Sequence, residues 1–463
     1  MSRTNDLGQD RISRLVIRLA IPTMLAQLVN VLYSIVDRMY IGTGVGSLAL
    51  AGVGVCAPIV TLLTSFGSMV GQGGAPIMAM QMGSGDHKSA KQTLNNGFFM
   101  LLVLSAVLTG LFLLTKDQLL MWFGASEATF SYANTYVTIY TAGTFFALIS
   151  GRLNSFLIAQ GFSGLGMATV VIGAILNIIL DPLFIFVFHM GVAGAAIATV
   201  ISQIVSCLFV LGCLFSKRMP VRLGWGDFHV SVMKRIVTFG FSPFLILASD
   251  SILLIVLNTV LQRYGGPGEG DTLVTCATIV QSYLLLITMP MGGLTLGSQP
   301  VVSFNYGAAN LERIKRAIQS IVALCVTFCV LMTVVTHTLS PVFVGLFTQN
   351  PEVAARSVRY IKVFTAMIIP LAIQYPLVDE TTALGHVRLA LFCSIFRKCV
   401  FLAGLLLLPA LVSPEATFLS EPIADAVAAT VTTCLFLHFF PKILAQRAAR
   451  KREEREEQPK VAP

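Results

Sequence analysis

Two aspartates stand inside stretches of sequence that are otherwise apolar enough to cross a membrane. Asp37 lies in the stretch that begins near residue 15, and Asp181 lies in the one that begins near residue 164. An acidic side chain inside a span costs roughly 3 kcal/mol or more, so its presence indicates a functional site. Asn177 is four residues before Asp181 and shares its helix face, and Pro182 leaves the carbonyl of Ile178 without its helical hydrogen bond. Such a group of oxygens is suited to binding a proton or a small cation.

Depth in the membrane adds two residues to this set. At about 1.5 Å of rise per residue, Asp37 lies about 8 Å from the outer end of its helix, and Asp181 lies near the outer end of its own. Tyr136 and Thr199 each follow the outer start of a helix and lie about 12 Å deep. We therefore predict a cation-coupling site in the outer half of the first repeat, formed by Asp37, Asn177, Asp181, Tyr136 and Thr199.

The predicted site has two candidate coupling ions and one structural alternative. The two carboxyl groups could hold H+, or Asp37, Asn177 and Asp181 could coordinate Na+ with neutral oxygens completing the shell. In the structural alternative, Asp37 pairs with the adjacent Arg38 or caps a broken helix. Beyond the coupling ion we predict no cofactor, and the nine cysteines, which form no CxxC pair, are expected to be free packing thiols.

The composition requires a membrane to surround these residues. Of the 463 residues, 55% are hydrophobic and only 11% are charged, and the mean hydropathy is +0.81. Apolar runs of spanning length recur throughout the chain. We predict an all-α integral membrane protein of about twelve helices, beginning near residues 15, 48, 92, 128, 164, 191, 234, 272, 314, 353, 388 and 420.

The chain is a duplicated unit. Gly73, Pro76, Gly83 and Lys91 recur 224 residues later as Gly297, Pro300, Gly307 and Lys315. The predicted domains are an N-terminal lobe (1–216), a cytoplasmic linker (217–233), a C-terminal lobe (234–445) and a charged cytoplasmic tail (446–463). A duplicated membrane bundle whose halves differ in their polar residues is typical of a transporter with its site between or within the lobes.

The Lys and Arg residues of the short loops predict how the chain is oriented. They gather on the side that holds Arg11, Lys88, Lys217, Arg313 and the C-terminal tail, so both termini should be cytoplasmic. The net charge of +9 is then explained by loops that face anionic lipid, and nucleic acid is not an expected partner. Localisation in the plasma (inner) membrane, contact with the lipid bilayer and a monomeric state are expected.

The second repeat carries a different set of polar residues. Asn258 takes the register of Asp37 at an offset of 221, and Tyr360 takes that of Tyr136 at 224. Asp250, near the middle of its span, either binds a cationic substrate or faces the cavity or a neighbouring helix. Arg397 lies deep enough to need a carboxylate, which Asp379, Glu380 or Asp250 could supply. Asp379 and Glu380 are otherwise expected to reach the loop near Arg388. The predicted substrate and cavity residues are Asp250, Asn258, Gln281, Tyr360 and Arg397.

An intramembrane enzyme would need paired catalytic groups. The phrases HExxH and GxSxG are absent, and the phrase GxGD ends at Asp86 and Asp271, in expected loops and without a YD partner. We predict that the chain is not an enzyme.

Several motifs resemble the MATE (multidrug and toxic compound extrusion) transporter family, over nearly the whole chain. They are PTMLAQLVNVLYSIVD (22–37), GGAPIMAMQMGSGD (73–86), NIILDP (177–182), GVAGAAIATV (191–200) and GSQPVVSFNYGAANLERIK (297–315), and with SIFRK (394–398) they are most similar to the MepA-like branch. The resemblance implies two six-helix lobes, related by a pseudo-twofold axis, that form a V-shaped cavity opening to each side in turn. It also implies export of organic cations against an inward flow of protons or sodium.

The resemblance assigns roles to the same residues. Asp37 and Asp181 match the family's N-lobe carboxylates, and Asn177, Tyr136 and Thr199 match its polar neighbours. The glutamate and aspartate of the family's sodium-linked branch do not align with Asp250 and Asp379, so proton coupling is the expectation. The alternatives are a sodium-coupled drug antiporter and a flippase for lipids or lipid-linked substrates.

Overall fold

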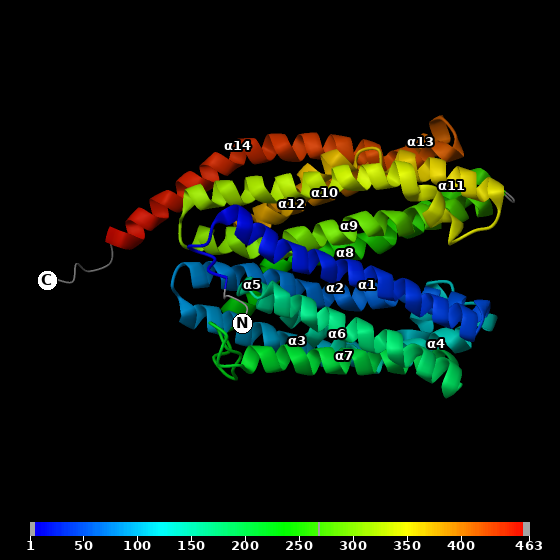
Figure 1. Ribbon diagram of the computed structural model, residues 1–463, viewed down its shortest axis with the longest axis horizontal. Coiled ribbons are helices and arrows are strands. Elements are labelled where there is room, and N and C mark those ends of the chain that lie inside the picture. Colours follow the sequence, from blue (N-terminus) through cyan, green and yellow to red (C-terminus); the bar gives the residue numbers. More distant parts are fainter. Residues whose placement is uncertain (1–4, 267–268, 457–463) are drawn as a thin grey trace. The chain divides into compact units, whose positions relative to one another are not determined.

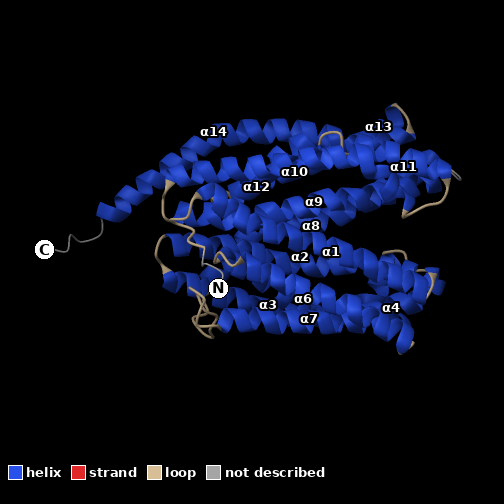
Figure 2. Ribbon diagram, in the orientation of Figure 1, coloured by secondary structure: helices blue, strands red, loops and turns tan. Residues whose placement is uncertain are grey.

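The computed structural model describes residues 5–266 and 269–456, and every regular element in that part of the chain is a helix (Figure 2). The first repeat contains α1 (Ile12–Gly44), α2 (Ser47–Gly83), α3 (His87–Trp122), α4 (Glu127–Ala142), α5 (Thr144–Ala159), α6 (Ser163–Pro182), the π-helix η1 (Leu183–Val187) and α7 (Gly191–Phe215). The second contains α8 (Val230–Gly265), α9 (Glu269–Gly307), α10 (Leu311–Gly345), α11 (Pro351–Phe364), α12 (Ile368–Ala383), α13 (Val387–Leu411), the 3-10 helix η2 (Pro414–Leu419) and α14 (Ser420–Glu456) (Figure 1).

The predicted number of spans is confirmed. Within the described residues, 10 helices are long and apolar enough to cross a membrane, and there are up to 12 spans if each of two bent pairs counts as one. The bent pairs are α4–α5, with a bend of 57°, and α11–α12, with a bend of 51°. Both pairs begin and end 224 residues apart, so the duplication extends to the break within the helix.

The described chain divides into two compact units. Unit 1 contains Ile21–Ala79 and Asp86–Ser251, and unit 2 contains Asn5–Ala20, Met80–Gly85 and the chain from Ile252 onward. The division falls within α1, α2 and α8 and in the turn between α2 and α3. Within each unit the long helices run side by side (Figure 1).

Residues 217–229 of the predicted linker (217–233) form an irregular belt against the helix ends of unit 1, and α8 begins at Val230. The amide groups of Gly224 and His229 donate to the side chains of Asn95 and Asn96, each over 2.9 Å. Val221 likewise donates to Gln160 Oε1 at the end of α5, over 2.9 Å. Because side-chain amides satisfy these backbone groups, the belt holds an irregular path against the helix ends.

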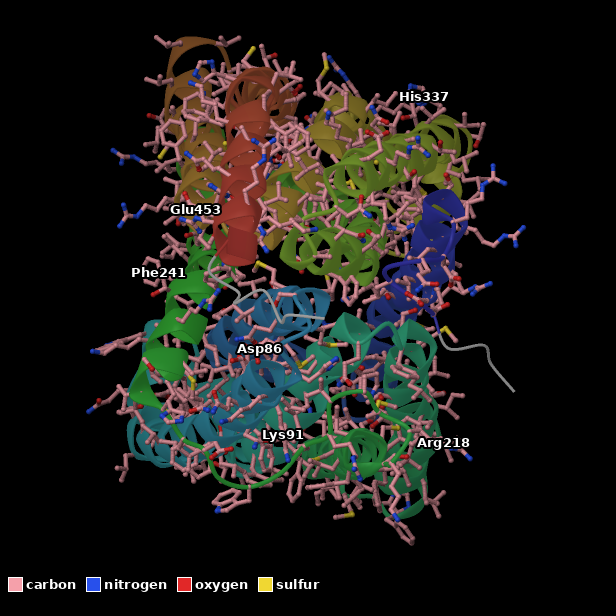
Figure 3. The ribbon with its side chains drawn as sticks, turned by 90° about the vertical axis from the view of Figure 1, so that its left-hand side faces the viewer. Asp86, Lys91, Arg218, Phe241, His337 and Glu453 are labelled. Atoms are coloured by element: carbon pink, nitrogen blue, oxygen red, sulfur yellow. The ribbon has the colours of Figure 1, made fainter. Side chains whose placement is uncertain are left out.

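The same end of unit 1 carries charged residues of the loops. Figure 3 looks onto this end, where Asp86, Lys91 and Arg218 lie. Asp86 caps α3 by accepting a hydrogen bond from the amide of Ser89 over 2.9 Å. Hydrogen bonds from Ser89, first through its side chain and then through its backbone, hold the pKa of Asp86 below its ordinary value.

The predicted tail is partly a docked helix. Helix α14 continues to Glu456, and Arg447 donates to the carbonyls of Tyr306 and Gly307 over 2.9 and 2.7 Å. Lys451 donates to the carbonyl of Ala308 over 2.6 Å. These cations pair with carbonyls that the end of α9 leaves without helical partners. Residues 457–463 lie outside the described residues.

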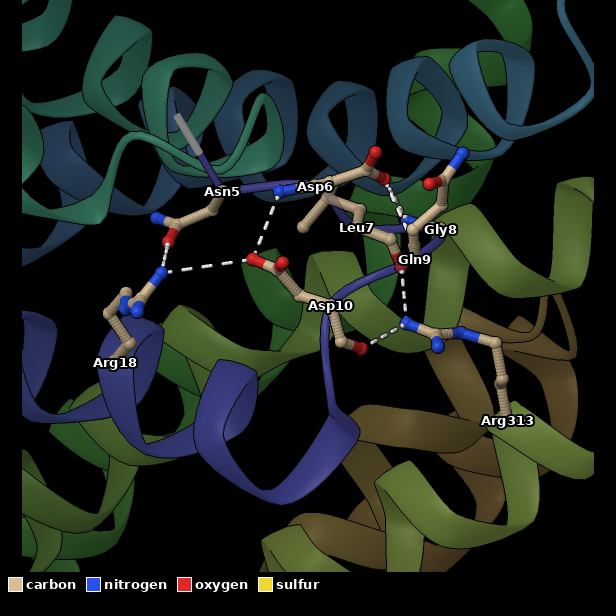
Figure 4. A network of polar contacts seen from close by, with 8 residues as sticks. All are labelled: Asn5, Asp6, Leu7, Gly8, Gln9, Asp10, Arg18 and Arg313. Carbon is tan, nitrogen blue, oxygen red and sulfur yellow. Dashed lines mark hydrogen bonds and ion pairs between the residues drawn. The ribbon is translucent and has the colours of Figure 1, made fainter. Parts of the chain in front are cut away.

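A polar network fixes the N-terminal segment within unit 2 (Figure 4). Arg313 on α10 donates to the carbonyls of Leu7 and Asp10 over 3.1 and 2.8 Å. Asp6 accepts from the amides of Gly8 and Gln9, which folds the segment into a turn. The start of α1 is therefore attached to the start of α10.

Candidate functional site

The end of α6 is shaped so that α1 can pack against it. Pro182 lacks an amide hydrogen, and the chain continues after it as the π-helix η1. Gly44 lies so close to this segment that a Cβ there would be 2.6 Å from Ile185 and 2.7 Å from Phe186. Tyr40 also meets Phe186 edge to face, with ring centroids 6.2 Å apart. This packing places the last turns of α1 beside the end of α6.

Three of the predicted residues form a hydrogen-bonded group between α6 and α7. Asn177 Nδ2 donates to Asp181 Oδ1 over 3.2 Å and lies 3.4 Å from Thr199 Oγ1. Thr199 donates in turn to the carbonyl of Ala195 over 3.1 Å. Asp181 is 0% exposed and Asn177 is 2% exposed, so the protein encloses this group.

The carboxyl group of Asp37 completes the cluster. It lies beside the carboxyl group of Asp181, and Asp37 is 9% exposed. Among the described residues, no donor reaches Asp37 Oδ1, Asp181 Oδ2 or Asn177 Oδ1. Two facing carboxyl groups need a proton or a cation between them, because two bare negative charges at this distance repel each other. Such an arrangement is chemically suited to binding a proton or a small cation.

Aromatic residues line the next part of the cluster. Tyr136, which is 8% exposed, stacks on Tyr140 with ring centroids 6.1 Å apart and planes 13° apart. Tyr33 lies near Asp37, Asp181 and Tyr140 and was missed by the sequence analysis. The signal was available, since Tyr33 is four residues before Asp37 and shares its helix face. The structure thus brings together all five predicted coupling residues and adds Tyr33.

The predicted residues of the second repeat have separate surroundings. Asp250 on α8 is exposed within unit 1, and Gln281 on α9 is half-buried in unit 2. Asn258 lines a shallow depression with Gln262 and Arg263. The Tyr360 side chain is 3% exposed and stacks on Phe418 with centroids 4.1 Å apart.

Arg397 has acidic partners that the sequence analysis did not consider. Its guanidinium contacts Glu421, and it donates to Asp425 over 2.8 Å. These two carboxylates stand one turn apart at the start of α14 and are 8% and 0% exposed as side chains. Glu421 and Asp425 were not among the suggested partners, whereas Glu380, which was, has no hydrogen-bond partner among the described residues. The position of Arg397 in the sequence could not reveal these partners, because they come from another helix.

Asp379 and Glu380 point inward from α12. Asp379 accepts a hydrogen bond from Thr295 Oγ1 over 2.6 Å. Glu380 is 0% exposed, and neither of its carboxyl oxygens has a hydrogen-bond partner among the described residues. The expectation that Glu380 reaches toward the loop near Arg388 is therefore wrong, since the side chain is enclosed by unit 2.

The donor set around Asp37 suits a proton or a small hard cation. Across the described residues, no group of three or more His, Cys, Asp or Glu side chains has the arrangement of a metal site. The cluster instead combines two carboxyls with the neutral oxygens of Asn177, Thr199 and the tyrosines. Hard cations such as Na+ are bound by oxygen ligands of this kind, so the residues also fit the sodium alternative.

Comparison with known proteins places the chain among transporters. The family model MatE matches residues 22–183 and again 245–406, which are the two repeats. The multidrug export protein MepA of Staphylococcus haemolyticus is 26% identical over 440 residues, covering 93% of each chain. The protein of the same name from Staphylococcus aureus is 24% identical over 413 residues, covering 89% of this chain and 90% of that one.

Solved structures show the same fold. An outward-facing multidrug resistance MATE family transporter of the MOP superfamily superposes with a TM-score of 0.88 at 24% identity, covering 96% of this chain and 99% of that one. A MOP superfamily transporter from Pyrococcus furiosus, described as having a binding pocket of reversed polarity, gives the same TM-score, identity and coverage.

Proposed function

This chain belongs to the MatE family, and from that premise we propose that it is a multidrug efflux transporter that exchanges organic cations for protons. It is a multi-pass membrane transporter and not an enzyme. Export of several drugs is inferred from the similarity to multidrug export proteins, and coupling to protons is inferred from the site in unit 1.

The facing carboxyl groups of Asp37 and Asp181 carry the proposal. One proton shared between them removes half of the negative charge. The hydrogen bond that Asn177 donates to Asp181 stabilises the negative charge that is left. Loss of that proton leaves two enclosed negative charges, which only another positive charge can offset at low cost. Proton binding and the binding of an organic cation therefore exclude each other, which is the condition for antiport.

The aromatic neighbours support a cationic substrate. Tyr136 and Tyr140 present stacked rings beside the carboxyl pair, and Tyr33 adds a third ring. Aromatic faces attract organic cations by about 0.5 to 2 kcal/mol each when water is excluded. The site thus offers charge compensation and apolar area together, which suits flat cationic dyes and drugs.

Sodium coupling is the second candidate. It is favoured by the neutral oxygens of Asn177 and Thr199, which a proton does not need but a sodium ion would coordinate. A flippase acting on lipids is the third, and it would require cationic side chains along its path.

The setting of the transporter is also part of the proposal. The distribution of Lys and Arg supports a plasma-membrane protein with both termini in the cytoplasm. The lipid bilayer and small organic cations are its proposed partners, the protein acts as a monomer, and it binds no nucleic acid.

Transport by purified protein in proteoliposomes tests the function. Ethidium uptake would be measured under an imposed pH gradient without sodium, for the wild type, Asp37→Asn and Asp181→Asn. Asp117→Asn is the matched control, because the Asp117 side chain is 67% exposed and pairs with Lys116. We expect proton-driven transport by the wild type and the control, and loss of at least about 90% of it in the two site variants.

The other outcomes distinguish sodium coupling and a lipid substrate from the proposed function. Transport that begins only when a sodium gradient is added assigns coupling to sodium. An absence of ethidium transport under either gradient would overturn the drug-efflux proposal and favour a lipid substrate.

A further inference from the structure

An arginine lies in the interior of unit 1, away from the carboxyl pair. Arg152 is on α5, eight residues before Gln160, and Gln160 binds the belt at the end of that helix. At about 1.5 Å per residue, the Arg152 backbone is about 12 Å from this end. The residue is only partly accessible within unit 1.

Two glycines of α2 show which way the side chain points. A Cβ on Gly71 would lie 3.0 Å from the Arg152 carbonyl oxygen, so this turn of α2 is level with the arginine backbone. A Cβ on Gly67, one turn earlier, would lie 3.0 Å from Cγ and 3.1 Å from Nε of Arg152. The side chain therefore extends along α2 away from the belt. It does not reach back toward the near end of its helix, as a snorkelling arginine would.

The guanidinium has no acidic partner. Within the described chain, Arg152 makes no hydrogen bond or ion pair, and the side chain of Tyr140 is near it. Arg397 differs from Arg152 in this respect, because its guanidinium contacts the carboxylates of Glu421 and Asp425. Placing the five N–H donors of a guanidinium in a membrane interior without an acceptor costs free energy. Charged residues in such positions usually line a transport pathway or bind a ligand.

We propose that Arg152 is an anion subsite that binds a carboxylate or phosphate oxyanion on an amphipathic substrate. Arginine is the side chain best suited to this, because its planar fork binds an oxyanion with two parallel hydrogen bonds. Gly67 and Gly71 leave the space in which its stem lies.

The subsite is continuous with the proposed cation site. Tyr140 is near Arg152, stacks on Tyr136, and so connects the guanidinium to the region of Asp37. Twelve residues separate Tyr140 from Arg152 along the bent α4–α5 pair, which corresponds to roughly 18 Å of backbone or less. A molecule with a cationic end and an anionic end could therefore contact both positions. The inference rests on the proposed drug transport and adds that an acidic group on the substrate is recognised.

A matched pair of dyes tests the subsite. Rhodamine 110 has a free carboxylate, and rhodamine 123 is its methyl ester, so they differ in that one charge. Their binding to purified protein would be measured by fluorescence anisotropy for the wild type, Arg152→Gln, Arg152→Lys and Arg218→Gln. Arg218→Gln is the control because Arg218 is an exposed cation on the belt (Figure 3).

We expect Arg152→Gln to weaken binding of the acid about 10-fold or more, since a charge-assisted hydrogen bond is lost. Binding of the ester should change by less than about 2-fold, which shows that the variant is folded. Arg152→Lys should give an intermediate affinity for the acid, because it keeps the charge and loses the fork. The control should match the wild type for both dyes.

Equal effects of Arg152→Gln on acid and ester, or none on either, would overturn the subsite. Wild-type protein that binds and transports the ester in those circumstances leaves the proposed function intact, so the two failures are distinguishable. A short-chain phosphatidylglycerol, used below its micelle concentration, identifies the source of the oxyanion. If it displaces the acid from the wild type, the subsite accepts lipid phosphate; if it does not, the subsite selects the carboxylate.

Discussion

Gly83 and Gly307, which hold equivalent positions in the two repeats, each lie against the backbone of the other's helix. A Cβ on Gly83 would overlap the carbonyl oxygen of Phe304, and a Cβ on Gly307 would overlap that of Met80. Met80 and Phe304 are themselves separated by the repeat offset of 224. The contact is therefore reciprocal, as expected when a twofold axis passes between two equivalent elements.

Alanine at either glycine should destabilise the protein. The added methyl group meets a backbone carbonyl, which cannot rotate aside as a side chain could, and overpacking of this kind costs about 1 to 3 kcal/mol. Gly110→Ala on α3 is the control, because a Cβ there meets nothing within 4 Å. Thermal melts of the purified protein, followed by size-exclusion chromatography, should show a lower apparent Tm for Gly83→Ala and Gly307→Ala. Melting of all three variants with the wild type would show that the helices can separate freely here.

Proton release should accompany the binding of an organic cation. Because the carboxyl pair holds either a proton or the cation, tetraphenylphosphonium added to wild-type protein in unbuffered detergent near pH 7 should release about one proton per protein. Asp37→Asn and Asp181→Asn should release almost none. A pH electrode measures this directly. Release that is unchanged in both variants would place the exchanged proton on another group.

The contact between Asn177 and Thr199 should tune transport without being essential. Thr199→Val removes the hydroxyl at almost constant volume, and the loss of a buried hydrogen bond of about 1 kcal/mol corresponds to roughly a 5-fold lower rate. Thr199→Ser retains the hydroxyl and should stay near the wild-type rate. Initial rates of ethidium uptake distinguish the two. If Thr199→Ser loses activity while Thr199→Val keeps it, the methyl group and not the oxygen is the important part.

Much of the fold could be predicted from the sequence because the bilayer imposes it. Apolar runs of spanning length predicted the helices, whereas the bends within α4–α5 and α11–α12 were not predicted, although they recur at the 224-residue repeat. The pairing of Asn177 with Asp181 followed from helical spacing alone. These features are local or periodic, so one sequence is enough to reveal them.

Contacts between distant helices could not be predicted in this way. Glu421 and Asp425 are 24 and 28 residues from Arg397, and only the packing of α13 on α14 brings them together. The belt depends on the side chains of Asn95 and Asn96, about 130 residues away. Arg152 could not be predicted as a site residue from the sequence, because only the three-dimensional arrangement shows that it has no acidic partner.

The docked tail gives a further prediction. Arg447→Gln removes the donors to the carbonyls of Tyr306 and Gly307, and each lost charge-assisted bond costs about 1.5 to 3 kcal/mol. Arg450→Gln is the matched control, since Arg450 is exposed on the same helix. Limited proteolysis should cut the former variant faster between α9 and α10, while the control keeps the wild-type pattern. Identical patterns would mean that the tail does not stabilise this end of unit 2.

The Arg397 triad offers a choice between a structural and a substrate-binding role. Arg397→Met leaves the enclosed carboxylates of Glu421 and Asp425 without their cation, and breaking a buried ion pair in this way costs about 3 to 5 kcal/mol. The triple variant with Glu421→Gln and Asp425→Asn removes the charges together, so it should recover most of the lost stability. Arg397→Lys should recover little, because one ammonium cannot hold two carboxylates as the guanidinium fork does.

Thermal stability and ethidium transport, measured on the same preparations, separate the two roles. A triple variant that regains both shows that Arg397 holds α13 to α14 and does not touch the substrate. A triple variant that is stable but does not transport would indicate that Arg397 binds substrate. We expect the first result, because the two carboxylates already engage the guanidinium and leave little of it for a substrate; its side chain is 22% exposed.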